Sequence, residues 1–131
     1  MLATDDDKVV YLSNTCEGKR HDKKLCDEQK LEFQDGIEIL QDSGFIGYEP
    51  ENVSVTMPIK KRKKVELTDE QKEYNKKVAS VRVKIEHVIG GIKRLEIVGR
   101  KLRCKKGRFR DVVMMIACGL HNFRTDFRAK K

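Results

Sequence analysis

A repeat of apolar residues between positions 68 and 95 constrains the fold more than any other feature of the sequence. The apolar positions recur at steps of four and three residues, which is the spacing of one face of an α-helix. They are Tyr74, Val78, Val81, Ile85, Val88, Ile92 and Leu95. Thr68 followed three residues later by Gln71 is typical of a capping box at a helix start. The sequence therefore predicts a long amphipathic helix, which packs on a sheet or pairs as a coiled coil.

Glu86 is an acid beside this apolar stripe, with Arg82 one helical turn before it and Lys93 near the same line. A carboxylate in this position lies at the boundary between core and solvent, where an ion could be held. Gly90 and Gly91 follow, and a glycine inside a helix costs roughly 1 kcal/mol relative to alanine. The pair therefore indicates a bend, a close packing contact or room for a ligand.

Short apolar segments before the long helix predict strands. Residues 37–41 form a largely apolar run that ends at Asp42, just before a glycine turn at Gly44. Residues 53–59 alternate strictly between apolar and other side chains, and Pro58 lacks the N–H that a sheet ladder needs. A half-buried strand near the margin of a sheet is expected there.

The remaining elements are two helices and a strand. Residues 8–13 follow three aspartates and indicate a strand after a turn, and residues 22–35 predict a weak helix that Asp22 would cap. A final amphipathic helix has its apolar positions at Phe109, Val112, Val113, Ile116, Ala117, Leu120 and Phe123. This order of strands and helices predicts an α/β fold with a sheet covered by helices.

The two parts of the chain carry opposite charge. Residues 1–59 contain 6 basic and 13 acidic residues, whereas residues 60–131 contain 23 basic and 8 acidic residues. Lysines and arginines at that density repel one another unless phosphates or solvent screen them. We expect the basic half to bind nucleic acid, and a merely solvated surface is the alternative.

Several classes of protein are disfavoured. The four cysteines include no C-x-x-C pair, so neither a zinc site nor a secreted disulfide framework is expected. No apolar run approaches the roughly 20 residues of a membrane-spanning helix. The first residues lack the pattern of a signal peptide. The sequence therefore predicts a cytoplasmic protein with no membrane partner.

Four motifs occur in an order that resembles a known family. They are GKRHDKK at residues 18–24, QDSGFIGY at 41–48, VKIEHVIGGIKR at 83–94 and IACGLHNFR at 116–124. Together they are similar to the second half of a bacterial insertion-sequence transposase of the DDE superfamily. The resemblance covers nearly the whole chain, and four motifs in order are far more specific than any one of them.

The resemblance implies a ribonuclease-H-like fold, with a mixed sheet flanked by helices, in which three carboxylates bind two divalent metal ions. It assigns the second aspartate to Asp42 and the glutamate to Glu86, which are then the catalytic and metal-binding residues. Two Mg²⁺ or Mn²⁺ ions need such anionic oxygen ligands. The first aspartate has no counterpart in the sequence, so we expect the fold to lack its first catalytic strand; Asp22 or Asp7 is left open as a replacement.

A truncated DDE transposase or endonuclease is thus the expected function. Its reaction is two-metal phosphodiester cleavage and strand transfer, as in transposition and DNA recombination, and the isolated chain is expected to be inactive. Residues 1–131 form a single partial catalytic domain with its basic half at 60–131. The residues expected to bind DNA are Lys60, Lys61, Arg62, Lys63, Lys64, Lys93, Arg94, Arg103, Lys105, Lys106 and Arg108.

Other functions fit parts of the sequence. The chain could be a non-enzymatic DNA-binding module, or a regulator or inhibitor of the full transposase. Its partners besides DNA would be an upstream transposase polypeptide or further copies of itself. The histidines His87 and His121 are expected to pack rather than to bind metal, because Mg²⁺ prefers oxygen ligands to imidazole.

Overall fold

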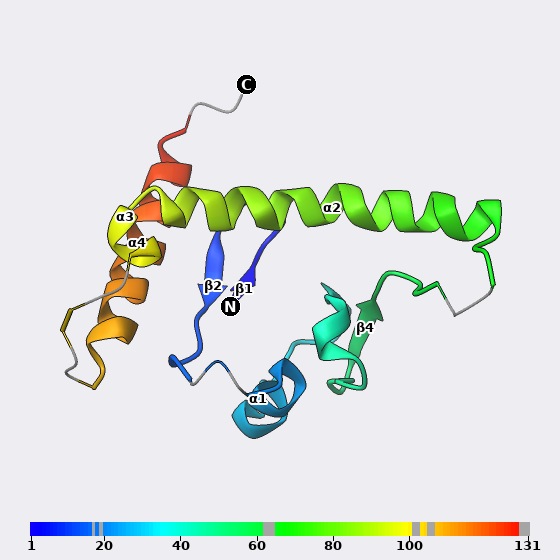
Figure 1. The fold of residues 1–131 in the computed structure, drawn as a ribbon, viewed down its shortest axis with the longest axis horizontal. Helices are drawn as coiled ribbons and strands as arrows, with labels where there is room; N and C mark the ends of the chain where they lie inside the picture. The colour runs from blue at the N-terminus through cyan, green and yellow to red at the C-terminus, as the bar shows by residue number, and fades with distance from the viewer. Residues whose placement is uncertain (17, 19, 62–64, 101–102, 105–106, 129–131) are drawn as a thin grey trace. The chain divides into compact units, whose positions relative to one another are not determined.

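Figure 1 shows the computed structural model, which describes residues 1–16, 18, 20–61, 65–100, 103–104 and 107–128. Its elements are β1 (Leu2–Ala3), β2 (Val9–Tyr11), α1 (Asp22–Gln29), β3 (Ile37–Leu40), the 3-10 turn η1 (Ser43–Phe45), β4 (Val53–Thr56), α2 (Asp69–Lys93), α3 (Glu96–Gly99) and α4 (Phe109–Asp126). The mixture of strands and helices confirms the predicted α/β class.

The chain divides into two compact units, and the division falls inside α2. The first contains Met1–Thr15 and the described residues from Val83 onward, and we call it the hairpin unit. The second is Cys16–Arg82, which we call the strand-pair unit. Each unit contains one two-stranded sheet of its own.

The hairpin unit is named for β1 and β2, which pair antiparallel with Leu2 opposite Tyr11 and Ala3 opposite Val9. The aspartates between them form the turn, and Asp7 takes the left-handed conformation at φ 64°, which aspartate tolerates better than most residues. The predicted turn and strand are thus confirmed, although the strand is shorter than residues 8–13.

The core of the hairpin unit lies where the hairpin, α2 and α4 meet. Its buried residues are Val9, Val88, Ile92, Ala117 and Cys118, with Ala3, Leu12, Leu95 and Val98 packed against them. The two core residues of α4, Ala117 and Cys118, have small side chains, which allow α4 to lie close to β2 and α2.

Helix α2 confirms the predicted long helix and its start. The Thr68 N–H donates to Gln71 Oε1 over 3.1 Å, and the Gln71 N–H donates to Thr68 Oγ1 over 3.3 Å. This is the reciprocal pair of a capping box. The apolar stripe is buried only in places: Val88 is 1% exposed, whereas Val81 is 44% exposed.

The two glycines of α2 have different surroundings. The helix continues past both of them to Lys93. A Cβ added to Gly91 would lie 2.6 Å from His121 Cε1 and still closer to Nδ1, whereas a Cβ on Gly90 would meet nothing within 4 Å. Close packing against α4 therefore explains Gly91, and Gly90 has no such contact.

Helix α4 forms as predicted, but the side that it buries differs from the expected one. Its buried residues are Val113, Ala117, Cys118 and His121. Five of the seven residues on its predicted apolar face are 37% to 63% exposed. They are Phe109, Val112, Ile116, Leu120 and Phe123. Hydrogen bonds from His121 and Asn122 to the hairpin hold the helix in this rotation.

In the strand-pair unit, β3 and β4 pair parallel, with Ile37 opposite Val53 and Leu40 opposite Thr56. Strand β4 ends before Pro58, as the missing proline N–H predicts. Helix α1 ends at Gln29, earlier than expected. The prediction that Asp22 caps it is wrong by one residue, because His21 is the N-cap and makes no side-chain capping bond. Asp22 instead lies in the first turn, where its charge favours the helix dipole.

No helix within the described residues is both long and apolar enough to cross a membrane.

Candidate active site

Asp42 lies directly beyond the ladder of β3, at the carboxyl end of a parallel strand. The Gln41 N–H still donates to Thr56 O over 2.9 Å, and the Gln41 side chain donates to Tyr48 O over 3.3 Å. The carboxylate of Asp42 then caps η1 by accepting the Ser43 N–H at Oδ1 over 2.7 Å. The strand end and the turn thus fix the position of an exposed carboxylate. Ligands of open α/β sheets bind at such strand ends.

Arg82 of α2 contacts the same carboxylate. Its Nη1 lies 3.5 Å from Asp42 Oδ1, and the two side chains are 54% and 52% exposed. An ion pair this accessible to water contributes about 0–1 kcal/mol to stability. The pair therefore influences the charge around Asp42 more than it stabilises the fold.

The first turn of α1 lies against the turn that carries Asp42. A Cβ on Gly44 would come within 2.8 Å of Asp22 Oδ2, and one on Gly47 within 3.3 Å of Lys23 Cε. Gly47 also has a φ of 83°, which side chains disfavour. These glycines let the first turn of α1, which contains Asp22 and Lys23, approach the turn closely.

Glu86 is exposed on α2, one turn after Arg82. It belongs to the hairpin unit and Asp42 to the strand-pair unit, so a metal ion shared by the two carboxylates stays a prediction. Across the described ranges, no three or more His, Cys, Asp and Glu side chains are grouped so that they could hold a metal ion.

The basic residues expected to bind DNA are exposed wherever the structure describes them. These are Lys60, Lys61, Lys93, Arg94, Arg103 and Arg108. Lys61 Nζ lies 3.6 Å from Glu66 Oε1, an exposed ion pair that leaves the lysine accessible. The other five, Arg62, Lys63, Lys64, Lys105 and Lys106, lie outside the described residues.

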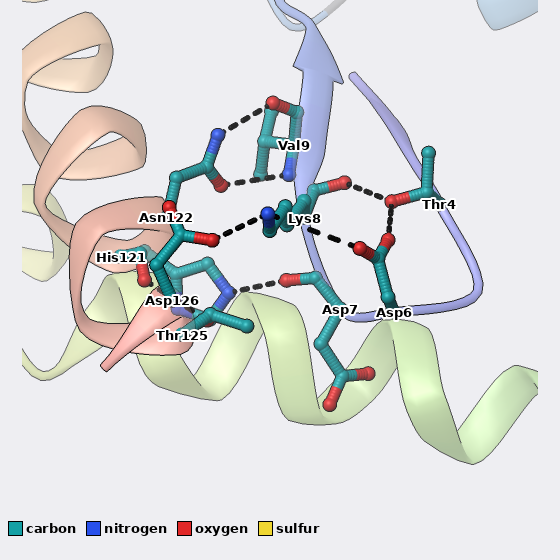
Figure 2. A network of polar contacts seen from close by, with 9 residues as sticks. All are labelled: Thr4, Asp6, Asp7, Lys8, Val9, His121, Asn122, Thr125 and Asp126. Carbon is teal, nitrogen blue, oxygen red and sulfur yellow. Dashed lines mark hydrogen bonds and ion pairs between the residues drawn. The ribbon is translucent and has the colours of Figure 1, made fainter. Parts of the chain in front are cut away.

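The sequence patterns did not reveal a polar network that ties α4 to the hairpin (Figure 2). Asn122 accepts the Val9 N–H and donates to Val9 O, both over 2.8 Å, while His121 Nε2 lies 2.8 Å from Asp7 O. His121 is buried, which confirms its expected packing role, whereas His87 is exposed on α2 and the same expectation is wrong there. Lys8 pairs with Asp126, and this contact raises the pKa of the lysine. An asparagine at the end of an amphipathic helix gives no signal of such a bond in a sequence.

Comparison with known proteins identifies the family to which the chain belongs. Residues 1–122 match the family described as DDE superfamily endonuclease, and the chain belongs to this family. A relative named "Probable transposase for insertion sequence element IS702", from Microchaete diplosiphon, is 30% identical over 112 residues. The match covers 86% of this chain and 40% of that relative, so the chain spans less than half of the relative's length. No solved structure matches the chain significantly.

Proposed function

We propose that this chain supplies two metal-binding carboxylates, Asp42 and Glu86, to an endonuclease that cuts and joins DNA in transposition. The observation that carries the proposal is the exposed Asp42 carboxylate, which the Ser43 N–H holds at the end of β3 inside the segment that matches the family. Residues 1–131 would form part of one ribonuclease-H-like catalytic domain.

The chemistry of these two side chains suits Mg²⁺ or Mn²⁺, because both ions prefer carboxylate oxygens. Bound at this site, the ions would activate the attacking oxygen and stabilise the leaving one. The role of this chain is to hold both carboxylates in position, so that neither side chain has to move when the ions bind. The capping bond of Asp42 and the helical backbone at Glu86 serve that task. A third carboxylate is needed, and Asp22 or Asp7 stays open as its source within this chain.

Cleavage of a DNA duplex in Mn²⁺ tests the proposal. We expect no cleavage by the 131-residue chain, and cleavage after addition of a polypeptide that carries the first-strand aspartate implied by the family resemblance. Asp42→Asn and Glu86→Gln should each abolish that activity, since each removes a ligand charge and keeps the shape of the side chain. Glu96→Gln, at an exposed glutamate of α3, is the matched control. Full activity of Glu86→Gln would overturn the assignment.

The basic residues would bind the DNA backbone with little sequence preference, because phosphate contacts release counterions and do not read bases. Lys93 and Arg94 are an adjacent exposed pair near the end of α2. Their replacement by alanine should lower the log–log salt dependence of binding by about 2, at roughly 0.9 per phosphate contact. Lys76 and Lys77, another adjacent exposed pair on α2, are the control. Equal slopes for both double variants would show that Lys93 and Arg94 are only solvated.

Replacing residues 60–64 by alanine extends this test to the densest basic run. We expect a reduction of several units in the salt slope if each residue contacts a phosphate. DNA binding that persists without any cleavage in the complemented assay would favour a non-enzymatic DNA-binding module.

A further inference from the structure

One oxygen of Asp42 already has two partners. Oδ1 accepts the Ser43 N–H over 2.7 Å and lies 3.5 Å from Arg82 Nη1. The guanidinium therefore lies next to an oxygen that a cation would bind. Arg82 is also four residues before Glu86, one turn earlier on α2. The arginine is therefore a spatial neighbour of Asp42 and a neighbour of Glu86 along the helix.

We propose that Arg82 is a built-in counter-cation of Asp42, which balances the charge of the carboxylate before a divalent ion binds and moves away when one does. The inference rests on the proposed function, since it requires Asp42 to be a metal ligand. It makes entry of the ion an exchange of one cation for another.

The exposure of the pair makes this exchange feasible. Both side chains are about half exposed, so water can solvate the guanidinium as it leaves. Exposed ion pairs are weak, and a positive charge at this distance still repels an arriving dication. The Ser43 N–H bond does not depend on Arg82, so the carboxylate keeps its place when the arginine moves.

Mn²⁺ binding measures the effect directly, without any cleavage reaction. The ion is paramagnetic, and its binding at Asp42 should broaden the NMR signal of the Ser43 amide, which bonds to the Asp42 carboxylate. In low salt, Arg82→Gln should reach half-maximal broadening at a Mn²⁺ concentration roughly threefold to fivefold lower than the wild-type chain, on the scale of a surface ion pair. Added salt should shrink this difference, because it screens the repulsion.

Two controls separate a local effect from a change in net charge. Lys77→Gln removes one positive charge from the same helix at an exposed residue that pairs with Glu73 over 3.5 Å, and it should leave the midpoint unchanged. Arg82→Lys keeps the charge and should stay close to wild type. Arg82→Ala removes the charge in a second way and repeats the measurement if Arg82→Gln does not fold.

Asp42→Asn distinguishes the two proposals. Broadening that persists in Asp42→Asn, or its absence in the wild-type chain at every Mn²⁺ concentration, would overturn the metal site and the inference with it. Broadening that Asp42→Asn removes, with equal midpoints for wild type, Arg82→Gln and Lys77→Gln, would leave the metal site standing and overturn the counter-cation role of Arg82.

Discussion

Two asparagines make the same backbone clamp in the two units, in different surroundings. Asn122 accepts the Val9 N–H and donates to Val9 O, both over 2.8 Å, in a partly buried position. Asn75 accepts the Ile59 N–H over 2.8 Å and donates to Ile59 O over 3.0 Å in an exposed one. Water competes for the second clamp and much less for the first, so equal geometry should give unequal stabilisation.

The same contrast extends to the units as wholes. The hairpin unit buries residues of β2, α2 and α4 in one core. Among the described residues of the strand-pair unit, Val78 and Gln41 are the buried ones. That unit depends on the β3–β4 ladder and on local turns, and it carries Asp42. The proposed ligand is thus held by backbone hydrogen bonds, whereas the unit with Glu86 has a packed core.

The largest expected effect tests the close packing of the hairpin unit. Gly91→Ala should destabilise the protein by about 1–3 kcal/mol, because its Cβ would overlap the buried His121 ring. Gly90→Ala should stabilise it by up to about 1 kcal/mol, because alanine favours the helix and meets nothing there. Urea denaturation followed by circular dichroism measures both. Similar values for the two variants would show that α4 does not pack on Gly91.

The two asparagine clamps give the next effect and test the comparison itself. Asn122→Ala should cost about 2 kcal/mol, because it leaves the N–H and C=O of the buried residue Val9 without their partner. Asn75→Ala should cost about 0.5 kcal/mol, since water can replace the amide at Ile59. Urea denaturation of both variants under identical conditions measures the difference. Equal losses would mean that burial does not distinguish the units.

The capping box of α2 gives a smaller effect in the strand-pair unit. Thr68→Ala should cost about 1 kcal/mol, because Gln71 N–H loses its acceptor. Thr68→Ser keeps the hydroxyl and is the control. Thermal unfolding of the three chains checks this, and a loss of the same size in both variants would contradict the capping role.

Local signals in the sequence predicted local structure well. The spacing of apolar residues and the Thr68–Gln71 pair predicted α2, and the run that ends at Asp42 predicted β3. The buried side of α4 could not be predicted, because bonds from Asn122 to Val9, 113 residues away, decide its rotation. The ion pair between Arg82 and Asp42 could not be predicted for the same reason, since only the fold brings together a strand end and a helix residue 40 positions later. Periodicity records which residues are apolar, and it does not record which polar residue finds a distant backbone partner.

The smallest effect depends on pH and concerns Asp111 of the hairpin unit. The Thr15 hydroxyl donates to Asp111 Oδ1, and the Thr15 N–H donates to the same oxygen over 2.6 Å. These bonds favour the charged form and hold the pKa of Asp111 below its usual 3.8. A carboxylate with a lowered pKa in the folded state contributes stability above the unfolded pKa, and this contribution is lost as the pH falls through the folded pKa.

Asp111→Asn should therefore lower the free energy of unfolding near neutral pH. The difference in this free energy between the variant and wild type should shrink as the pH drops below 3.8 and Asp111 loses its charge. Urea midpoints measured across acidic pH values check this course. Asp35→Asn, at an exposed carboxylate of the strand-pair unit, is the matched control for the loss of one negative charge. A constant difference between Asp111→Asn and wild type at every pH would show that Thr15 binds the amide as well as it binds the carboxylate. The loop that follows β2 would then be joined to α4 by the shape of the Asp111 side chain and not by its charge.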